Sequence, residues 1–337
     1  MWIYLDKEFK KTLFCYIIIM GGTMKKIVIL GGGTGLSTLL RGLKYFPVEI
    51  TAIVSVCDDG KSTGRLRQEF HQPAMGDIRK VMVSLSETEP LVQELLEYRF
   101  NTTSDLNGHA VGNLLLTAMT NITGNMIDGI SALSKILNLK GRVLPLTEDD
   151  ITLISEMSDG TTVVGEHNIT ESPKKIKKVY YKEEPRVCNE VLKAIEKADL
   201  VILSMGSLYT SIIPNLICRD IIKELDKLDK KIMYVCNMVT QPGETDNMKV
   251  SDHIRILDTY LGNHKVDVVI ANNGVITKDI ALKYQTEEQK DPVILDEEKI
   301  NNMNVELIKN DYVRVDENMI RHNVEKLALD IYSYMVR

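Results

Sequence analysis

A glycine-rich loop near the start of the chain combines residue types that bind phosphate. Residues 31–35 read Gly-Gly-Gly-Thr-Gly, between an apolar run at 27–30 and a helical pattern at 36–43. Glycines let a phosphate approach the backbone closely, and the free amides at the start of a helix attract an anion. Because Leu36 replaces the third glycine of a dinucleotide fingerprint, a purely structural turn stays an alternative. We interpret this segment as a candidate phosphate loop formed by Gly32, Gly33, Thr34 and Gly35.

A second loop, residues 58–65, follows another apolar run and begins with Asp58 and Asp59. In dinucleotide-binding units an acid roughly twenty residues after the glycine loop accepts the ribose hydroxyls. The same pair could instead hold a magnesium ion that bridges phosphates, or cap a turn or helix. The rest of the loop offers backbone, hydroxyl and guanidinium groups to phosphate oxygens, through Gly60, Ser62, Thr63 and Arg65. The spacing of a P-loop is absent.

Four later segments repeat this chemistry of glycine, polar side chains and charge. GDIRK at 76–80 combines a glycine, an acid and a base, and GHAVGN at 108–113 opens an apolar helical pattern. GSLYTS at 206–211 resembles a second anion cradle, and the polar loop from 237 suits a sugar or base. A turn held by its own hydrogen bonds, or a structural histidine, would account for some of these residues equally well. The candidate binding residues are Gly76, Asp77, Arg79, His109, Asn113, Ser207, Tyr209, Thr210, Asn237 and Gln241.

The elements that must position these residues alternate along the chain. Buried strands are predicted at 26–30, 50–56, 200–203, 232–235 and 266–270, and helices at 36–43, 90–99, 113–121, 126–137, 191–197, 217–228, 248–261 and 323–335. This alternation predicts an α/β fold, with a Rossmann-like, mostly parallel sheet and helices on both faces. Because ligands bind beyond the carboxyl ends of such strands, the loops above should form one site.

Residues 142–182 differ from the rest and predict a small β-rich subdomain. Short extended stretches occur at 142–146, 152–156, 161–164 and 177–181, so we expect a single domain from 24 to 337 with this insertion. The basic stretch at 174–178 alternates with an apolar residue, which favours a solvated strand edge or loop over an anion-binding patch.

Composition excludes several classes of protein. The net charge of −6 and the mixing of both signs argue against a nucleic-acid-binding surface. The five cysteines form no CxxC pair, which argues against a metal site and favours a reducing cytoplasm. Cys57 lies beside the two aspartates, where a buried structural thiol is favoured over a nucleophile.

The first 23 residues need a separate interpretation. The apolar run at 13–20 is too short to span a bilayer, and no other segment resembles a transmembrane helix. We expect translation to begin at Met24, with residues 1–23 a mis-assigned start or a disordered extension. Peptide mapping of the native N-terminus tests this expectation.

Taken together, the motifs GGGTG, DDGxSTGRLR, GDIRK, GHxxGNLLL, GSLYTSIIPNL and NxxTQPGETDN resemble one family, over residues 25–334. This is the bacterial gluconeogenesis factor family (YvcK-type), within the CofD-like superfamily of 2-phospho-L-lactate transferases. The resemblance implies a cytoplasmic protein that binds a UDP-sugar, notably UDP-N-acetylglucosamine, and ties gluconeogenic carbon metabolism to wall-precursor synthesis and cell shape. It also implies a protein partner in that synthesis, and we expect a homo-oligomer.

The resemblance places particular residues of this chain at the nucleotide. Residues 32–35 fall on the nucleotide loop, the two aspartates at the ribose or metal position, and Ser62, Thr63 and Arg65 on the phosphate loop. Arg321 matches a basic pair ahead of the last helix, while Val324 departs from the threonine often found there. Transferase relatives use magnesium and a guanosine diphosphate donor, with a shorter second loop. The longer loop here favours a regulator.

Three hypotheses therefore stand. The first is a UDP-sugar-binding regulatory protein without turnover, because no nucleophile with a paired base is evident. The second is a magnesium-dependent transferase using a nucleotide-diphosphate donor, with Asp58 or Asp59 on the metal. The third is an NAD-binding protein, suggested only by the first loop and the acids.

Overall fold

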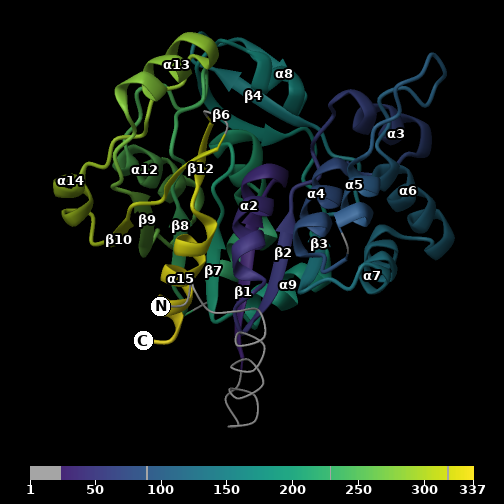
Figure 1. Ribbon diagram of the computed structural model, residues 1–337, viewed down its shortest axis with the longest axis horizontal. Helices are drawn as coiled ribbons and strands as arrows, with labels where there is room; N and C mark the ends of the chain where they lie inside the picture. The colour runs from purple at the N-terminus through teal and green to yellow at the C-terminus, as the bar shows by residue number, and fades with distance from the viewer. Residues whose placement is uncertain (1–23, 89, 228, 317–318) are drawn as a thin grey trace.

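A parallel seven-stranded sheet forms the centre of the protein (Figure 1). The computed structural model describes residues 24–88, 90–227, 229–316 and 319–337. Residues 1–23, with the apolar run at 13–20, lie outside the described residues. In spatial order the strands are β10 (Glu306–Asn310), β9 (Val268–Asn272), β8 (Ile232–Val235), β7 (Leu200–Leu203), β1 (Lys25–Gly31), β2 (Val48–Val54) and β3 (Arg142–Pro145).

The order of the strands reverses next to β1. From β1 the chain moves outward through β2 to β3, then returns to the other side of β1 and continues from β7 to β10. Leu30 of β1 lies opposite Ile53 of β2 and Leu203 of β7, so these three strands end at the same edge. A ligand site is expected at this point, because the loops on the two sides of the reversal diverge there.

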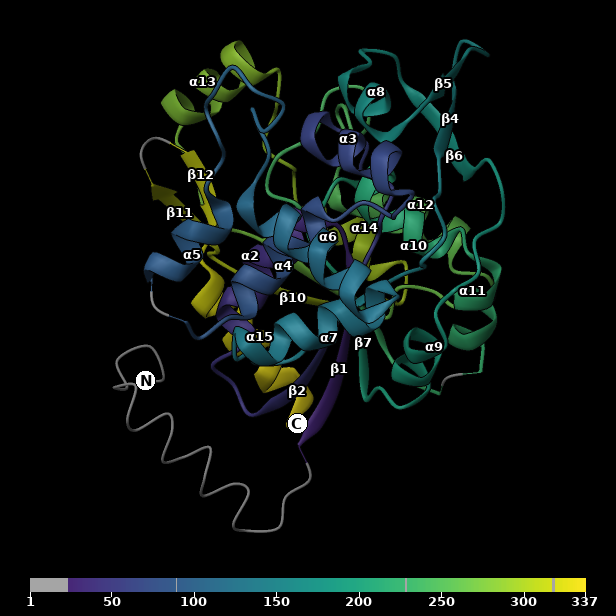
Figure 2. The ribbon, with the colours of Figure 1, turned by 90° about the vertical axis from the view of Figure 1, so that its right-hand side faces the viewer.

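Helices cover both faces of the sheet (Figure 2), as the sequence predicted. On one face α2 packs between α4 and α15, and on the other α9 packs against α11. The helices are α2 (Gly33–Leu43), α3 (Lys61–Phe70), α4 (Gly76–Leu85), α5 (Pro90–Glu97), α6 (Val111–Thr123), α7 (Met126–Ile136), α8 (Glu166–Glu171), α9 (Asn189–Glu196), α10 (Ile213–Leu216), α11 (Arg219–Leu225), α12 (Val250–Tyr260), α13 (Lys278–Glu288), α14 (Glu297–Asn301) and α15 (Val324–Met335), with a π-helical turn, η2, at Leu208–Ile212.

The composition of β1 explains why it lies at the centre. Its apolar residues from Ile27 to Leu30 are all at most 2% exposed, because both faces of the strand are covered. Such strands are continuous apolar runs rather than alternating ones. The helix that follows, α2, has glycine at its N-cap position and therefore no capping side chain of its own. Its first amide is satisfied from another element, described below.

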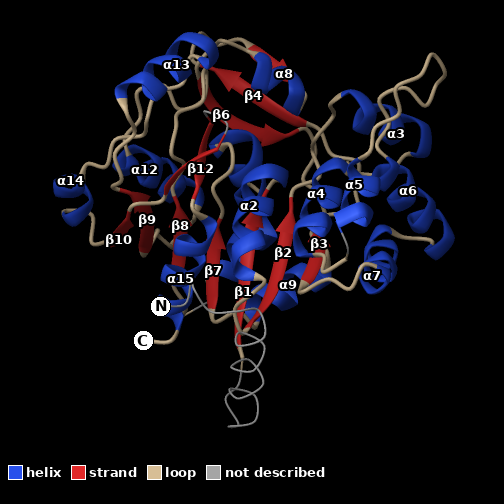
Figure 3. Ribbon diagram, in the orientation of Figure 1, coloured by secondary structure: helices blue, strands red, loops and turns tan. Residues whose placement is uncertain are grey.

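A small antiparallel sheet is inserted between β3 and β7 (Figure 3). It consists of β4 (Leu153–Met157), β5 (Thr162–Val164) and β6 (Ile176–Tyr181), with α8 between β5 and β6. Three of the four predicted extended stretches are confirmed. The remaining stretch, predicted at 142–146, does not belong to this subdomain. Residues 142–145 form β3, an edge strand of the main sheet parallel to β2. Lysines 174, 175, 177 and 178 are exposed along the linker and β6, as expected.

Several other elements were not predicted from the sequence. The second loop is shorter than expected because α3 begins at Lys61, and α4, α13, α14, β10 and the hairpin of β11 (Val313–Asp316) and β12 (Met319–His322) were missed. Among the described residues, no helix combines the length and hydrophobicity that crossing a bilayer requires. The cysteines in the described ranges, Cys57, Cys188, Cys218 and Cys236, are all free thiols.

The close approach of α2 to the loop after β7 predicts a large cost for a small substitution. A Cβ added to Gly35 would overlap the backbone carbonyl of Met205. We expect Gly35→Ala to lower the free energy of unfolding by about 1–3 kcal/mol, although alanine favours helix over glycine. Urea unfolding measures this change. Thr34→Ala, at an exposed neighbouring position, should change stability by under about 0.5 kcal/mol; equal effects would contradict the packing argument.

Candidate functional site

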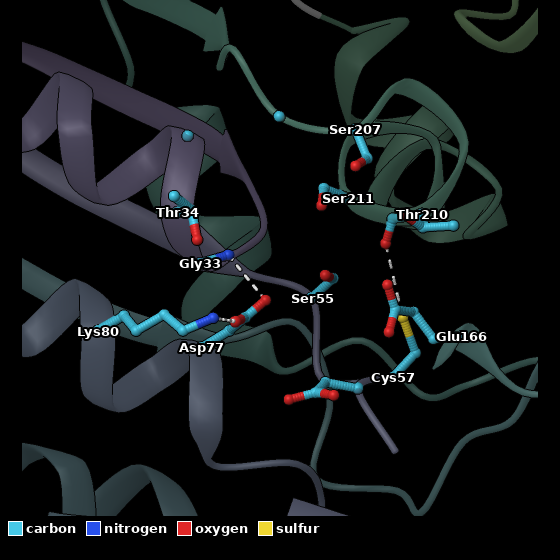
Figure 4. A pocket seen from close by; sticks show the side chains of 13 residues that line it. Gly33, Thr34, Ser55, Cys57, Asp77, Lys80, Glu166, Ser207, Thr210 and Ser211 are labelled. Carbon is cyan, nitrogen blue, oxygen red and sulfur yellow. Dashed lines mark hydrogen bonds and ion pairs between the residues drawn. The ribbon is translucent and has the colours of Figure 1, made fainter. Parts of the chain in front are cut away.

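A cavity of about 230 Å³ opens at the carboxyl edge of the sheet, between the loops that follow β1 and β7 (Figure 4). It lies at the reversal of strand order described above. Residues from the main sheet loops, α2, α4, η2 and the inserted subdomain line it: Gly33, Thr34, Gly35, Ser55, Cys57, Asp58, Asp77, Lys80, Glu166, Gly206, Ser207, Thr210 and Ser211.

One wall of the cavity is the N-terminus of α2. The backbone amide of Gly33 donates to Asp77 Oδ2 at 2.7 Å, so a carboxylate from α4 replaces the missing cap of α2. Lys80 Nζ lies 3.0 Å from Asp77 Oδ1. The amides of the first helical turn have no partner within the helix, and the helix dipole favours an anion there. This wall therefore combines anion-binding amides and an ammonium group with one resident carboxylate.

The facing wall is the turn η2 and carries hydroxyl groups. Ser207, Thr210 and Ser211 line the cavity from this turn. Two residues of the loop after β8 hold the turn in place. The buried Glu244 carboxylate accepts from the Tyr209 amide at 3.1 Å and from the Thr210 hydroxyl at 3.3 Å.

Gln241 extends this network to Ser207, the residue just before the turn. Its Oε1 accepts from the Ser207 hydroxyl at 2.6 Å, and its Nε2 donates to Glu244 Oε1 at 2.8 Å. π-Helical turns are uncommon and are often found at functional sites. The hydroxyls of Ser207 and Thr210 are thus fixed by a side-chain network rather than by regular helix bonding.

Two acidic side chains, Asp58 and Glu166, and the Cys57 thiol also line the cavity. Burial and the charge of Asp77 raise the pKa of Asp58, whose carboxylate accepts from the Gly60 amide at 2.9 Å. Burial, followed by the charge of Asp58, raises the pKa of Glu166 to about 7. Burial and nearby carboxylates also raise the pKa of the Cys57 thiol well above its ordinary value. A thiol that stays protonated is a poor nucleophile, which agrees with the structural role expected for Cys57.

The structure brings seven of the predicted residues to the cavity. They come from four separate segments, and the shared edge of the parallel strands gathers them: Gly33, Thr34, Gly35, Asp58, Asp77, Ser207 and Thr210. Gly32 is the N-cap position of α2, and a Cβ there would meet the Ser211 side chain. Whether these residues bind a ligand stays a prediction.

A second group of predicted residues lies behind the lining. The Ser62 hydroxyl and His109 Nδ1 are 3.0 Å apart, and the Thr63 hydroxyl bonds to Asp58. Gly76 starts α4 close to this bond. Arg79 is buried and donates to the Leu96 carbonyl.

The other members of this second group differ in their contacts. Asn113 is buried, and its Oδ1 has no partner among the described residues. Asn237 Nδ2 donates to the Gly206 carbonyl at 2.9 Å and so braces the loop after β7. Tyr209 and Gln241 support η2 as described above. None of the residues in this second group belongs to the lining of the cavity.

Three predicted residues point elsewhere. Asp59 Oδ1 accepts from the His167 amide at 2.8 Å, so it caps α8, which was the alternative kept open for this residue. Arg65 is exposed on α3, and Arg321 lies on β12, where it faces Arg314 across the hairpin. Neither arginine is part of the lining.

Arg67, on α3 two residues beyond Arg65, holds the backbone of the second loop in place. It is buried, its Nη2 forms an ion pair with Asp150 Oδ1 at 2.5 Å, and its Nη1 donates to the carbonyls of Cys57 and Asp58. The guanidinium group therefore holds the backbone that presents the Asp58 side chain to the cavity.

Four lining side chains were not among the candidate binding residues, although Lys80 and Ser211 belong to the GDIRK and GSLYTS motifs: Ser55, Lys80, Glu166 and Ser211. Ser55, Lys80 and Ser211 stand within or beside segments that had been singled out, so their proximity to Cys57, Asp77 and Thr210 was a usable signal. Glu166 had no such signal, because it comes from the inserted subdomain and only the folded chain brings it to the cavity.

The carboxylates do not by themselves form a metal site. Asp58, Asp77 and Glu166 line one cavity, yet the described residues include no group of three or more acids, histidines or cysteines placed to hold a metal ion. Magnesium binds proteins through one or two carboxylates with water and substrate phosphates. A magnesium ion here would therefore be held by one or two of these carboxylates together with water and ligand oxygens.

Comparison with known proteins identifies the family. The family model described as 2-phospho-L-lactate transferase CofD matches residues 27–313. The chain belongs to the CofD family. Within this family it is similar to proteins named gluconeogenesis factor, being 46% identical to that of Bacillus subtilis over 91% of this chain and 97% of the relative. The protein of that name from Halalkalibacterium halodurans is 45% identical, over 90% and 94% of the two chains.

A relative of known structure has the same fold. The crystal structure of a UPF0052-family protein from Bacillus halodurans matches with a TM-score of 0.87 and 44% identity, over 91% of this chain and 99% of that one. Both the resemblance seen in the motifs and the α/β fold expected from it are thus confirmed. The names of the relatives support a function related to theirs.

Burial of Glu244 predicts that stability depends on pH. Burial raises the pKa of this carboxyl from about 4.5 to about 7. The folded protein therefore holds the proton more tightly than the unfolded chain does. The resulting stabilisation is fully present below about pH 4.5 and is lost as the pH rises through about 7. At alkaline pH the fold keeps an ionised carboxylate out of water.

Replacing this carboxyl with a neutral amide should remove the dependence. The free energy of unfolding of Glu244→Gln minus that of wild type should become more favourable to the variant by about 1–3 kcal/mol as the pH rises from ~5 to ~8. Denaturant unfolding at the two pH values measures the difference. Glu196→Gln, at an exposed position at the end of α9, is the control, and a difference independent of pH for Glu244→Gln would contradict the assignment.

Proposed function

We propose that the protein binds a UDP-sugar, with UDP-N-acetylglucosamine the leading candidate, and acts as a regulatory factor without turnover of its own. In this role it links gluconeogenic carbon metabolism to wall-precursor synthesis and cell shape. The proposal joins the family membership of the chain to the chemistry of the cavity. The relatives named gluconeogenesis factor support the first part, and the arrangement of the two walls supports the second.

The observation that carries the proposal is the pairing of an anion-binding wall with a hydroxyl-lined wall at the reversal of strand order. The amides of α2 and the Lys80 ammonium suit a diphosphate, and the hydroxyls on η2 suit its outer oxygens or a sugar. Ligand pockets typically measure about 300–1,000 Å³, and this cavity is smaller. It would therefore hold the diphosphate and a neighbouring ring, with the rest of the ligand along the open rim.

The regulatory role extends to partners and location. We propose that the ligand-bound protein acts through a protein partner in wall-precursor synthesis, in the cytoplasm and as a homo-oligomer. Free thiols at the four described cysteines support a reducing compartment. No described residue assigns the partner surface.

The transferase hypothesis is the second candidate, and the acidic part of the cavity favours it. A carboxyl with a pKa of about 7, such as Glu166, is suited to general acid–base catalysis. The Cys57 thiol is not an activated nucleophile, and transfer from a diphosphate would need a metal ion held jointly with the substrate. We therefore rank the transferase second, and the NAD-binding hypothesis third.

Removing the cation of the cavity tests the assignment of the phosphate wall. We expect Lys80→Met to weaken binding of UDP-N-acetylglucosamine by about 1.5–3 kcal/mol, because it removes a charge-assisted contact to phosphate. Titration calorimetry gives the affinity. Arg65→Met, on the exposed face of α3, tests the expectation from sequence alone. If Arg65→Met weakens binding and Lys80→Met does not, the diphosphate lies outside this cavity.

A metal-dependence experiment separates the regulator from the transferase. We expect wild type to bind UDP-N-acetylglucosamine with similar affinity in magnesium and in chelator, and to release neither sugar nor phosphate. Calorimetry and chromatography of the recovered nucleotide provide the two readouts. Loss of binding in chelator, together with product formation in magnesium, would instead establish the enzyme.

A further inference from the structure

Glu166 is the one carboxylate that the inserted subdomain contributes to the cavity. It is the first residue of α8 and is separated by more than a hundred residues from the glycine loop that forms the opposite wall. In Figure 4 it enters from the side opposite Asp77 and Lys80, next to Cys57 and Thr210. The ligand would therefore lie between the anion-binding wall and this carboxylate.

One backbone feature and two hydrogen bonds fix the position of Glu166. Gly165, immediately before it, has a φ of 95°, a backbone conformation that favours glycine. The His167 amide, immediately after it, donates to Asp59 Oδ1 at 2.8 Å, which fastens the start of α8 to the second loop. The Thr170 hydroxyl donates to Glu166 Oε1 at 3.1 Å. The carboxylate is thus held in place before any ligand arrives.

The surroundings of Glu166 are acidic. Burial, followed by the negative charges of Asp58, Asp77 and Asp59, raises its pKa to about 7. The lysine in the lining is paired with Asp77, on the opposite side. Above this pH the carboxyl is ionised, and an ionised carboxylate accepts hydrogen bonds and repels phosphate oxygens. In that state this end of the cavity suits hydroxyl or amide groups and disfavours a further phosphate.

We propose that Glu166 determines which nucleotide the site accepts, by bonding to hydroxyl or amide donors on the group attached to the distal phosphate and by repelling a terminal phosphate. The site then selects a nucleoside diphosphate-sugar over a nucleoside triphosphate of the same base. This selectivity rests on the proposed function, because it presumes that the diphosphate lies on α2. It assigns the discrimination to a residue outside the nucleotide-binding motifs of the sequence.

The test compares UDP-N-acetylglucosamine with UTP at about pH 8.5, where the Glu166 carboxyl is ionised. Each nucleotide is titrated calorimetrically in chelator and again in magnesium. Wild type should bind the sugar nucleotide on the order of tenfold or more tightly than UTP in chelator. Glu166→Gln should tighten UTP binding on the order of tenfold and weaken sugar-nucleotide binding a few-fold, because the neutral amide removes the repulsion and one acceptor. Glu171→Gln, at an exposed position on the same helix, should match wild type.

A second variant keeps the test decisive if Glu166→Gln unfolds. Asp59→Ala removes the cap that holds α8 and leaves the Glu166 side chain intact. The preference for UDP-N-acetylglucosamine over UTP should therefore fall, by a smaller factor than in Glu166→Gln. Circular dichroism and thermal unfolding establish that each variant is folded.

An unchanged ratio of the two affinities in folded Glu166→Gln would overturn the selectivity and leave the proposed function standing. If wild type binds neither nucleotide in either condition, the proposed function itself fails, and the inference fails with it.

Discussion

The hydrogen bond from the Gly33 amide to Asp77 joins α2 to α4, the two helices that form the anion-binding wall of the cavity. Helix α2 begins with glycines that allow close approach to the loop after β7, and so it has no capping side chain of its own. Asp77 supplies the cap from α4 and binds Lys80 with its other oxygen. A carboxylate at a helix N-terminus is stabilising, so this contact fixes α2 against α4 and sets the charge of the anion-binding wall at once.

Carboxylates hold the other walls in the same way. Glu244 secures η2, and Asp59 secures the start of α8. Each satisfies backbone amides that would otherwise lack partners, at points where the chain leaves regular structure. The cavity thus owes its shape to acids that cap short helical segments.

The sequence was most informative where the sheet determines the geometry. Continuous apolar runs identified β1, β7 and β8, and because parallel strands end at a common edge, Thr34, Asp58 and Ser207 could be expected near one another. Arg65 shows where this reasoning ended. Residues 58–65 were expected to form a loop, whereas α3 begins at Lys61 and helical spacing puts Thr63, Leu66 and Arg67 on the buried side. Arg65 then faces solvent.

Because a small sheet is inserted between β3 and β7, the lining of the cavity comes from two sources, the main sheet and the inserted subdomain. The positions of the glycine loop, α4 and η2 all depend on the register of the main sheet, so a change in one strand would disturb the neighbouring strands. The subdomain that carries Glu166 has an antiparallel pairing of its own, and Asp59 together with contacts from β6 to η2 and α10 joins it to the rest of the site. A change confined to this small sheet would therefore leave the strand pairing of the main sheet intact. The fold thus allows the end of the cavity that carries Glu166 to be altered separately from the wall formed by α2 and α4.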